Sequence, residues 1–371
     1  MDHFKPHPGS TFEGYFSKFT LSTGGTVILI LCTVPRADQR RHMLSFTYQP
    51  SSTSDASNAF QQEVWLDELD LIPNPADGVA FQIFCSNGYM RVSTDHRTEY
   101  KIEHESFTFH AVTDALTQTP WTPDSAQPVA PEGLFVHLPF PMHCVTLTIA
   151  EPAYLKNHAI PPTDLKPNLS ATVHQEKNWA TSFPPAHLWI QARNESTRAG
   201  FCLAGGPILG TESYLLSYRS SEPRNEYSFD LRPPLTTTLL PSILPASLNP
   251  SLLLSSREVS YPTRSVTLSF LTSFISPFRT ITVSAFADKD SFFSLSAPFA
   301  DGHRHNFCSQ SARATVKVQI LDLEERLGMW IYVPLVGWKR LGFGTHWKVV
   351  HEDVFERAGL EFGAEWYDDR G

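Results

Sequence analysis

The stretch His174-Gln-Glu-Lys-Asn-Trp-Ala-Thr-Ser-Phe-Pro-Pro-Ala-His-Leu-Trp-Ile-Gln191 decides the fold that we predict for this chain. It is typical of two short strands that flank a turn at Pro184-Pro185. Because side chains alternate between the faces of a strand, the even positions of 174–178 and the odd positions of 175–179 would lie on opposite faces. A polar strand face is buried only where its groups find partners, so this segment predicts a cavity or an internal hydrogen-bonded network.

Short runs rich in Val, Ile, Phe, Tyr and Thr, separated by Pro, Gly, Asn or Ser, make up most of the remaining chain. The clearest of these predicted strands are Thr26–Val34, Met43–Tyr48, Val79–Cys85, Ser106–Val112, Cys144–Ala150, Ser265–Phe270, Thr280–Phe286 and Ala314–Leu321. Helical periodicity is scarce. The best helix candidate is His351–Leu360, where Val354, Phe355 and Ala358 would share one side. The sequence therefore predicts an all-β protein.

The length of the chain indicates more than one hydrophobic core, because 371 residues exceed the usual size of a single core. Similar numbers of predicted strands lie on either side of Pro184-Pro185. We therefore expect two consecutive β-barrel or β-sandwich domains, residues 1–185 and 186–371. Small closed barrels can hold one apolar ligand, so a hydrophobic small molecule is the expected partner.

The composition disfavours several other partners. The formal net charge is −9, with 38 acidic against 29 basic residues and no basic run, which argues against nucleic-acid binding. The longest apolar run, Val27–Val34, is too short to span a bilayer and predicts a buried strand, so we expect no integral membrane association. The five cysteines are widely spaced and odd in number, which favours a reducing, cytoplasmic compartment. Nothing in the sequence sets an oligomeric state.

The sequence lacks the common motifs for metals, nucleotides and activated nucleophiles. The sequence contains no H-E-x-x-H, P-loop, G-x-G-x-x-G or G-x-S-x-G pattern. His303 and His305 would share one strand face, but no third ligand is close to them in the sequence. We therefore expect no metal and no cofactor, and an activity that survives dialysis against chelators.

Two proline-rich or polar passages, Thr117–Pro141 and Arg232–Ser256, interrupt the strand pattern. Loops of this length within a compact protein usually have a function or lack order. The second passage is too apolar for a solvated linker, since it contains Leu235, Leu239 and Leu240. It could form a lid over a pocket or a surface insertion with some leucines tucked inward.

Several motifs together resemble those of the tocopherol cyclase family. The central signature is Glu176-Lys-Asn-Trp179 followed by Phe183-Pro184 and Trp189-Ile-Gln191. Further matches occur in the family's order, at Pro6-His7-Pro-Gly, Phe12-Glu-Gly-Tyr-Phe16, Asp301-Gly-His-Arg304 and Leu360-Glu-Phe-Gly-Ala-Glu-Trp366. The chain departs from the family at Tyr15, where the family has tryptophan, and at Ala180-Thr-Ser182, where it has a glycine-rich run. The resemblance covers nearly the whole chain and implies a pocket that differs from the family's.

The resemblance implies a fold and a reaction. The fold is two successive lipocalin-like barrels or sandwiches, and the reaction closes a ring without a redox cofactor when a phenolic oxygen adds across a prenyl double bond. The first motif begins only five residues into the chain with no transit peptide before it, so we expect a different hydrophobic substrate from that of the plastid enzymes.

Two chemistries remain open for the ring closure. Proton-initiated closure needs a buried carboxylic acid, for which Glu176 and Asp301 are the candidates, although Asp301 could instead close a turn with Arg304. A pericyclic closure, such as an intramolecular Diels–Alder reaction, needs only a shaped pocket and a donor to a carbonyl. The candidate catalytic residues are Glu176, Asn178 and Asp301. The candidate substrate-binding residues are Glu13, Tyr15, Lys177, Trp179, Trp189, Gln191, His303 and Trp366.

Other classes of function compete with a cyclase. The aromatic wall that would stabilise a cation would equally suit a carrier of an apolar ligand, and the core of any β-sandwich contains such residues. Only the polar strand around Glu176 favours an enzyme over a ligand carrier. A purely structural relative is the third class.

Overall fold

The structure is a computed structural model. It describes residues 5–7, 9–51, 58–95, 97–113, 118–120, 142–155, 169–181, 183–208, 211–222, 226–233, 235–238, 254–273, 278–324, 328–333, 337–342 and 346–367. The all-β prediction is confirmed, since no α-helix occurs among these residues and strands make up most of them. Within the described part of the chain, no helix is long and apolar enough to cross a membrane.

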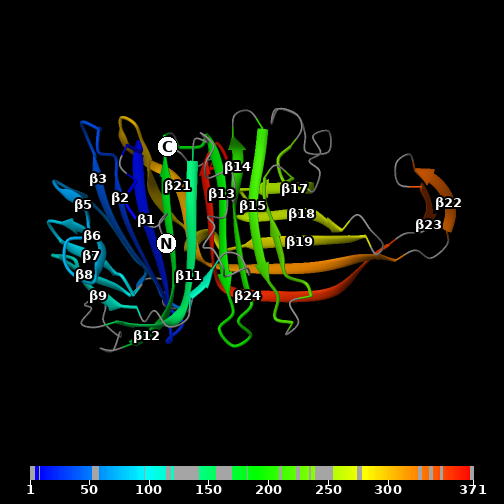
Figure 1. Ribbon diagram of the computed structural model, residues 1–371, viewed down its shortest axis with the longest axis horizontal. Helices are drawn as coiled ribbons and strands as arrows, with labels where there is room; N and C mark the ends of the chain where they lie inside the picture. The colour runs from blue at the N-terminus through cyan, green and yellow to red at the C-terminus, as the bar shows by residue number, and fades with distance from the viewer. Residues whose placement is uncertain are drawn as a thin grey trace. The chain divides into compact units, whose positions relative to one another are not determined.

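The first sheet contains twelve strands and lies entirely within the first half of the chain (Figure 1). Its members are β1 (Phe12–Leu21), β2 (Thr26–Thr33), β3 (His42–Gln49), β4 (Phe60–Leu66), β5 (Leu69–Pro73), β6 (Val79–Cys85), β7 (Gly88–Ser93), β8 (Thr98–His104), β9 (Phe107–Val112), β10 (Gln118–Pro120), β11 (Met142–Leu155) and β12 (Leu169–Ala180). The order along the main path is β4-β3-β2-β1-β12-β11-β9-β8-β7-β6-β5, and β10 pairs with β11. Strand β12 therefore enters the middle of the sheet, between β1 and β11.

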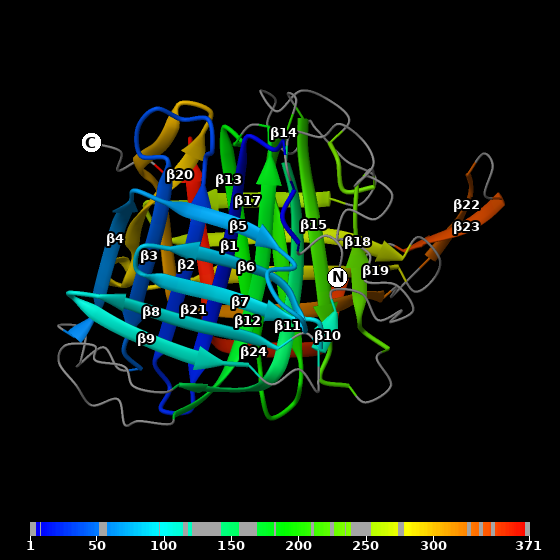
Figure 2. The ribbon, with the colours of Figure 1, turned by 60° about the vertical axis from the view of Figure 1, so that its left-hand side comes forward.

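The two ends of this sheet pack against each other around one apolar core. Figure 2 shows β5 to β9 crossing in front of β1, β2 and β3. The rings of Phe46 on β3 and Phe107 on β9 stack with centroids 4.3 Å apart, and Phe19 on β1 meets Phe109 edge-on at 5.1 Å. This face of the sheet, which we call the inner face, carries the odd-numbered residues of β1 and β12. The outer face of the same strands packs on a smaller cluster around Phe12, Cys32 and Ala180.

The second sheet has ten strands among the described residues. They are β13 (Ala186–Arg193), β14 (Gly200–Ile208), β15 (Thr211–Arg219), β16 (Phe229–Leu231), β17 (Leu254–Ser260), β18 (Ser265–Ser273), β19 (Arg279–Phe286), β20 (Phe293–Phe299), β21 (Gly302–Glu324) and β24 (His346–Ala364). The main path runs β16-β15-β14-β13-β24-β21-β19-β18-β17, with β20 paired to β21. A separate hairpin joins β22 (Gly328–Val333) to β23 (Gly337–Gly342).

The helix expected over His351–Leu360 is wrong, because these residues belong to β24. Arg357 has a φ of 58°, in the left-handed region, and this irregularity shifts the side-chain alternation by one residue. Phe355 and Ala358 are consequently both buried although they are three residues apart, which imitates a helical period. Val354 remains 44% exposed, as its place in a strand requires.

Contacts between Cα atoms divide the chain into two compact units. The first comprises residues 1–187, 290–313 and 361–371, and the second comprises residues 188–289 and 314–360. The chain thus returns to the first unit twice after leaving it. The two consecutive domains expected from the sequence, 1–185 and 186–371, stay a prediction.

The expected lid is described only in part. Residues 239–253 of Arg232–Ser256, and most of Thr117–Pro141, lie outside the described residues. At the start of the lid passage, Thr236 is buried and donates to the carbonyl of Tyr214, while Thr238 Oγ1 accepts from the backbone of Glu212 at 2.9 Å. Leu235 is 47% exposed. These contacts tie the first residues of the passage to β15, and the lid itself stays a prediction.

Candidate functional site

A cluster of ionisable and aromatic side chains lies on the inner face of β1 and β12. The antiparallel register places Glu13 opposite Trp179 and Tyr15 opposite Lys177. Because all four positions are odd-numbered, the strand alternation directs their side chains to the same face. Lys177 is fully buried, Glu13 and Tyr15 are each 2% exposed, and Trp179 is 7% exposed. Four of the predicted substrate-binding residues are therefore brought together.

The buried ammonium group of Lys177 has three acceptors. It is 3.3 Å from Glu13 Oε2 and 2.6 Å from His7 Nδ1, and it also donates to the carbonyl of Lys5. The rings of Tyr15 and Trp179 lie 5.1 and 5.3 Å from it. A buried cation is stable only when its hydrogens are bonded and its charge is balanced, and this arrangement supplies both conditions.

Burial alters the proton affinities of the cluster. Loss of hydration lowers the pKa of Lys177 to about 8, although Glu13 partly opposes the change. Burial together with the negative charge of Glu13 raises the pKa of Tyr15 well above its usual value. The Tyr15 hydroxyl lies 3.4 Å from Glu13 Oε2 as a donor. An amine with a pKa close to neutrality, in contact with a carboxylate and a phenol, is a common feature of sites that move or share protons.

Residues 5–7 and 9–10, which we call the N-terminal segment, cover this cluster. The imidazole of His7 stacks on Trp179 with centroids 4.0 Å apart and planes 6° apart. The backbone N–H of His7 donates to Glu13 Oε1, and Ser10 Oγ donates to the carbonyl of His7 at 3.1 Å. The Pro6-His7 motif therefore has a definite place, against the end of the Lys177 cluster.

Two cavities open beside the cluster. The smaller, of about 250 Å³, is lined by Pro6, His7, Gly9, Ser10, Glu13, Pro35, Leu71 and Pro73. The larger, of about 500 Å³, shares Pro35 and Leu71 with it and is otherwise lined by Thr33, Arg41, His42, Asp67, Glu68, Leu69 and Asp70. Burial and the nearby Arg41 lower the pKa of His42, whose Nδ1 lies 2.8 Å from Thr33 Oγ1. The larger cavity alone has the volume of a small-molecule site.

The outer face of β12 carries the other half of the central motif. Glu176 is 5% exposed and its Oε1 lies 2.8 Å from His174 Nε2, on the same strand face. Asn178 stands opposite Gly14 of β1 and is partly exposed. Both residues thus lie on the face opposite to Lys177 and Trp179. Their predicted catalytic role stays a prediction. Neither residue belongs to the Lys177 cluster or to the described lining of the two cavities.

Asp301 lies in the turn between β20 and β21, and Gly302, His303 and Arg304 begin β21. The Asp301 side chain is 72% exposed and pairs with Arg304 at 3.5 Å, which corresponds to the turn alternative considered for it. Gly302 has a φ of 124°, and a Cβ there would overlap the carbonyl oxygen of Gln39. His303 is buried, its Nδ1 donates to the carbonyl of Arg40 at 2.7 Å, and burial lowers its pKa to about 4. Neither Asp301 nor His303 is among the described residues that line the two cavities.

The remaining predicted residues have other surroundings. In the second unit, Trp189 is 8% exposed and packs so closely on Gly359 that a Cβ there would overlap its ring. Gln191 is buried in the same unit at 3% exposure. Trp366, in the first unit, is partly exposed near the end of the described chain.

The second unit contains a related pair of residues that was not selected as a candidate site from the sequence. Glu212 and Tyr214 are spaced as Glu13 and Tyr15 are, and the Tyr214 hydroxyl donates to Glu212 Oε2 at 3.0 Å. The cation is Arg257, whose Nε lies 3.1 Å from the same carboxylate. The Glu-x-Tyr spacing was visible in the sequence, but nothing there indicated which cation would join it.

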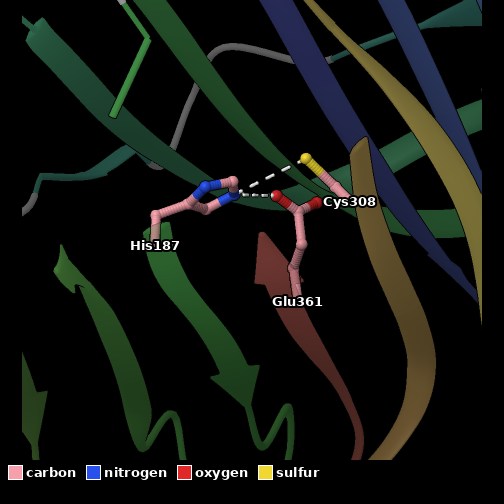
Figure 3. Close-up of side chains that lie close together, drawn as sticks. All are labelled: His187, Cys308 and Glu361. Atoms are coloured by element: carbon pink, nitrogen blue, oxygen red, sulfur yellow. Dashed lines mark hydrogen bonds and ion pairs between the residues drawn. The ribbon is translucent and has the colours of Figure 1, made fainter. Parts of the chain in front are cut away.

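A second group of reactive side chains, also missed, lies within the first unit. Figure 3 shows His187, Cys308 and Glu361 converging from β13, β21 and β24. His187 Nε2 is 2.6 Å from Glu361 Oε1 and 3.8 Å from Cys308 Sγ. Because 121 and 53 residues separate the three along the chain, no spacing motif could have predicted them.

No family model matches the chain, and no curated protein matches it. Solved structures do. An AttH from Nitrosomonas europaea aligns at 11% identity over 98% of this chain and 95% of that one, with a TM-score of 0.47. Kievitone hydratase from Nectria haematococca aligns at 9% identity over 98% and 91%, with a TM-score of 0.46. CghA with Sch210972 aligns at 12% identity over 96% and 88%, with a TM-score of 0.44.

Scores below 0.5 at such low identity support no statement about what this chain does. The resemblance to the tocopherol cyclase family therefore stays a prediction from the motifs.

Proposed function

We propose that this chain is a cofactor-independent enzyme that closes a ring within a hydrophobic, unsaturated small molecule. The observation that carries the proposal is the fully buried Lys177, held by Glu13, which lines a cavity with three prolines and Leu71 on its apolar side and His7 and Ser10 on its polar side. The proline and leucine side chains fold such a substrate into a compact shape, and a donor that is held in place by a fixed cation stabilises negative charge that develops on the carbonyl oxygen of the substrate.

His7 is the group that would touch the substrate. It lines the smaller cavity, and its Nδ1 accepts from Lys177. An imidazole that accepts at Nδ1 carries its proton on Nε2 when neutral, so His7 can act as a donor on its other side. Lys177 is then a positioning residue, which sets the tautomer of His7 and polarises its ring.

The same geometry favours a carbonyl-polarised, pericyclic closure over protonation of an alkene. Among the described residues that line the smaller cavity, the carboxyl group is that of Glu13, and it is paired with the Lys177 cation. Both oxygens of this carboxyl group are already engaged by protein donors, Oε2 by Lys177 and Tyr15 and Oε1 by the backbone N–H of His7, so neither is directed at a substrate alkene. A pericyclic closure needs only the donor and the shaped wall.

The test begins with metabolites, because the substrate is identified only by class. Metabolites of cells with and without the gene are compared, and the accumulating linear precursor is incubated with the purified full chain in deuterated water. We expect ring closure without deuterium in the product. His7→Phe should lower the single-turnover rate by about 10²-fold or more, since loss of one preorganised donor typically costs that much. His305→Phe, at an exposed histidine of the same unit, is the matched control.

A carrier function has one observation in its favour: three protein acceptors surround the Lys177 ammonium. A carrier would bind the precursor without converting it. Ring closure in the presence of the protein would then be no faster than ring closure in buffer alone. That outcome would overturn the enzymatic proposal, and deuterium in the product would overturn its pericyclic form alone.

A further inference from the structure

Three potential metal ligands converge on one point in the first unit, on the outer side of the first sheet. Their ligand atoms, His187 Nε2, Cys308 Sγ and a Glu361 carboxylate oxygen, all lie within 4.8 Å of one another. Cys308 packs with Ile30 and Phe183 in a small apolar cluster. Ile30 lies on the face of β2 opposite to the core residues Leu29 and Leu31, so this group is separate from the Lys177 cluster.

A nucleophilic triad does not explain the arrangement. In a Cys-His-acid triad the nucleophile bonds one imidazole nitrogen and the acid bonds the other. Here Glu361 and Cys308 both face Nε2, while Nδ1 of His187 is buried with no hydrogen-bond partner among the described residues. Three donor atoms directed at a common point are instead the arrangement of ligands around an ion.

The distances are close to those of tetrahedral zinc. Zinc–ligand bonds of about 2.0–2.3 Å at tetrahedral angles place nitrogen and sulfur about 3.6 Å apart, and nitrogen and oxygen about 3.4 Å apart. The observed Nε2–Sγ distance is 3.8 Å and the Nε2–Oε1 distance is 2.6 Å. Entry of the ion therefore requires the Glu361 oxygen to withdraw by roughly 0.8 Å, a small adjustment for a carboxylate.

The residues around the three ligands hold them in place. Gln310 Nε2 donates to the second carboxylate oxygen of Glu361 at 2.7 Å, which directs the first toward His187. The imidazole of His187 lies directly against Gly363, where a Cβ would overlap its ring. Phe183 meets the same imidazole edge-on at 5.2 Å. Hydrogen bonds and packing contacts that orient the metal-coordinating side chains in this way are typical of metal sites.

We propose that His187, Cys308 and Glu361 bind one zinc ion per chain, with water as the fourth ligand. Sulfur, nitrogen and a single carboxylate oxygen form a donor set that zinc prefers and that magnesium and calcium do not. The ion would join three strands, β13, β21 and β24, at one point. The proposal is independent of the ring-closing function, because it concerns a different face of the sheet.

The test uses the full chain, dialysed against a chelator and then titrated with zinc in competition with a chromophoric chelator. We expect one equivalent to bind and the melting temperature to rise with free zinc, as mass action requires. Cobalt(II) in place of zinc should give the absorption band of a thiolate–cobalt bond. Cys308→Ser should abolish this band, and Cys85→Ser, at another buried free thiol of the same unit, should keep it.

Two further variants keep the test decisive if Cys308→Ser folds poorly. Glu361→Gln should remove the stoichiometric binding, and Gln310→Met, which leaves all three ligands present, should weaken zinc affinity by about 10- to 100-fold. The proposal is overturned if the dialysed wild-type chain binds no equivalent of zinc. It is also overturned if Gln310→Met and Glu361→Gln bind zinc as the wild type does.

Discussion

The imidazole of His7 lies parallel to the indole of Trp179, with centroids 4.0 Å apart and planes 6° apart, although 172 residues separate them in the chain. The stack fixes the N-terminal segment over Lys177, which in turn donates to His7 Nδ1. Access to the buried amine therefore depends on this stack together with the hydrogen bonds that His7 and Lys5 make to Glu13 and Lys177.

The first prediction concerns that access. Lys177 should react slowly with formaldehyde and cyanoborohydride in the wild type, because it is fully buried. An aromatic stack is worth about 0.5–1.5 kcal/mol, so His7→Ala should speed the reaction about 2- to 12-fold if the segment opens locally. Peptide mass spectrometry measures the rate at Lys177, and the exposed Lys101 serves as the internal standard. An unchanged rate would show that the stack does not control entry.

The second prediction concerns pH. Burial lowers the pKa of Lys177 from 10.5 to about 8 in the folded chain. Between these values the unfolded chain binds the proton and the folded chain does not, so stability rises with pH, by up to about 1.4 kcal/mol per unit. Below pH 8 both states are charged and the slope vanishes.

Urea unfolding of the wild type and of Lys177→Met at pH 7 to 10 measures this slope as the difference between the two proteins. We expect the difference to be flat up to about pH 8 and then to move in favour of the wild type. Work above pH 10 is avoided, because the raised pKa of Tyr15 makes its ionisation oppose folding there. A flat difference throughout would mean that Lys177 keeps an ordinary pKa.

The third prediction separates the members of the Asp301-Gly302 turn. Asp301→Asn should change the free energy of unfolding by less than about 0.5 kcal/mol, because its side chain is exposed. Gly302→Ala should cost at least about 1–3 kcal/mol, since it combines a left-handed φ with overlap on Gln39. The matched control is Gly78→Ala, which has a φ of 77° and nothing within 4 Å of the added Cβ. If both substitutions lower the free energy of unfolding by the same amount, overlap with the Gln39 carbonyl oxygen does not contribute to the effect at Gly302.

The fourth prediction is a double-mutant cycle at Gly363 and His187. Gly363→Ala should destabilise the first unit by about 1–3 kcal/mol, because the new methyl group displaces the imidazole. In a His187→Ala background the same change should cost much less, since the ring is absent. Chemical denaturation of the four proteins without added metal gives the coupling energy. Additive effects would mean that the backbone, rather than the imidazole, rejects the methyl group.

The sequence predicts strands most reliably where one face of the strand is buried, because apolar and polar residues then alternate along it. Val79–Cys85 coincides with β6, and the run Thr26–Val34 is one residue longer than β2. Strand alternation in the sequence alone also separates the Lys177 face of β12 from the Glu176 face, as the structure has them. The pattern failed at Arg357, because a single left-handed residue shifts the alternation and nothing in the local composition signals it.

The site was predictable only in part, for a geometric reason. Glu13, Tyr15, Lys177 and Trp179 were selected from motifs, and the register of β1 with β12 brings them together. Which strand would neighbour β12 is set by the sheet as a whole and not by either segment alone. The same reason hid His187, Cys308 and Glu361, which meet only where β13, β21 and β24 come into contact.

The central pairing of β1 with β12 also bears on synthesis of the chain. Residues 22 to 168 must be made between the two strands, and at about 5–20 residues per second the ribosome needs about 7 to 30 s for them. During that interval one edge of β1 has its hairpin partner β2 and the other has no strand to pair with, so it can recruit a second nascent chain. Close spacing of ribosomes on the message should therefore lower the yield of folded protein, and chaperones that shield extended strands should restore it.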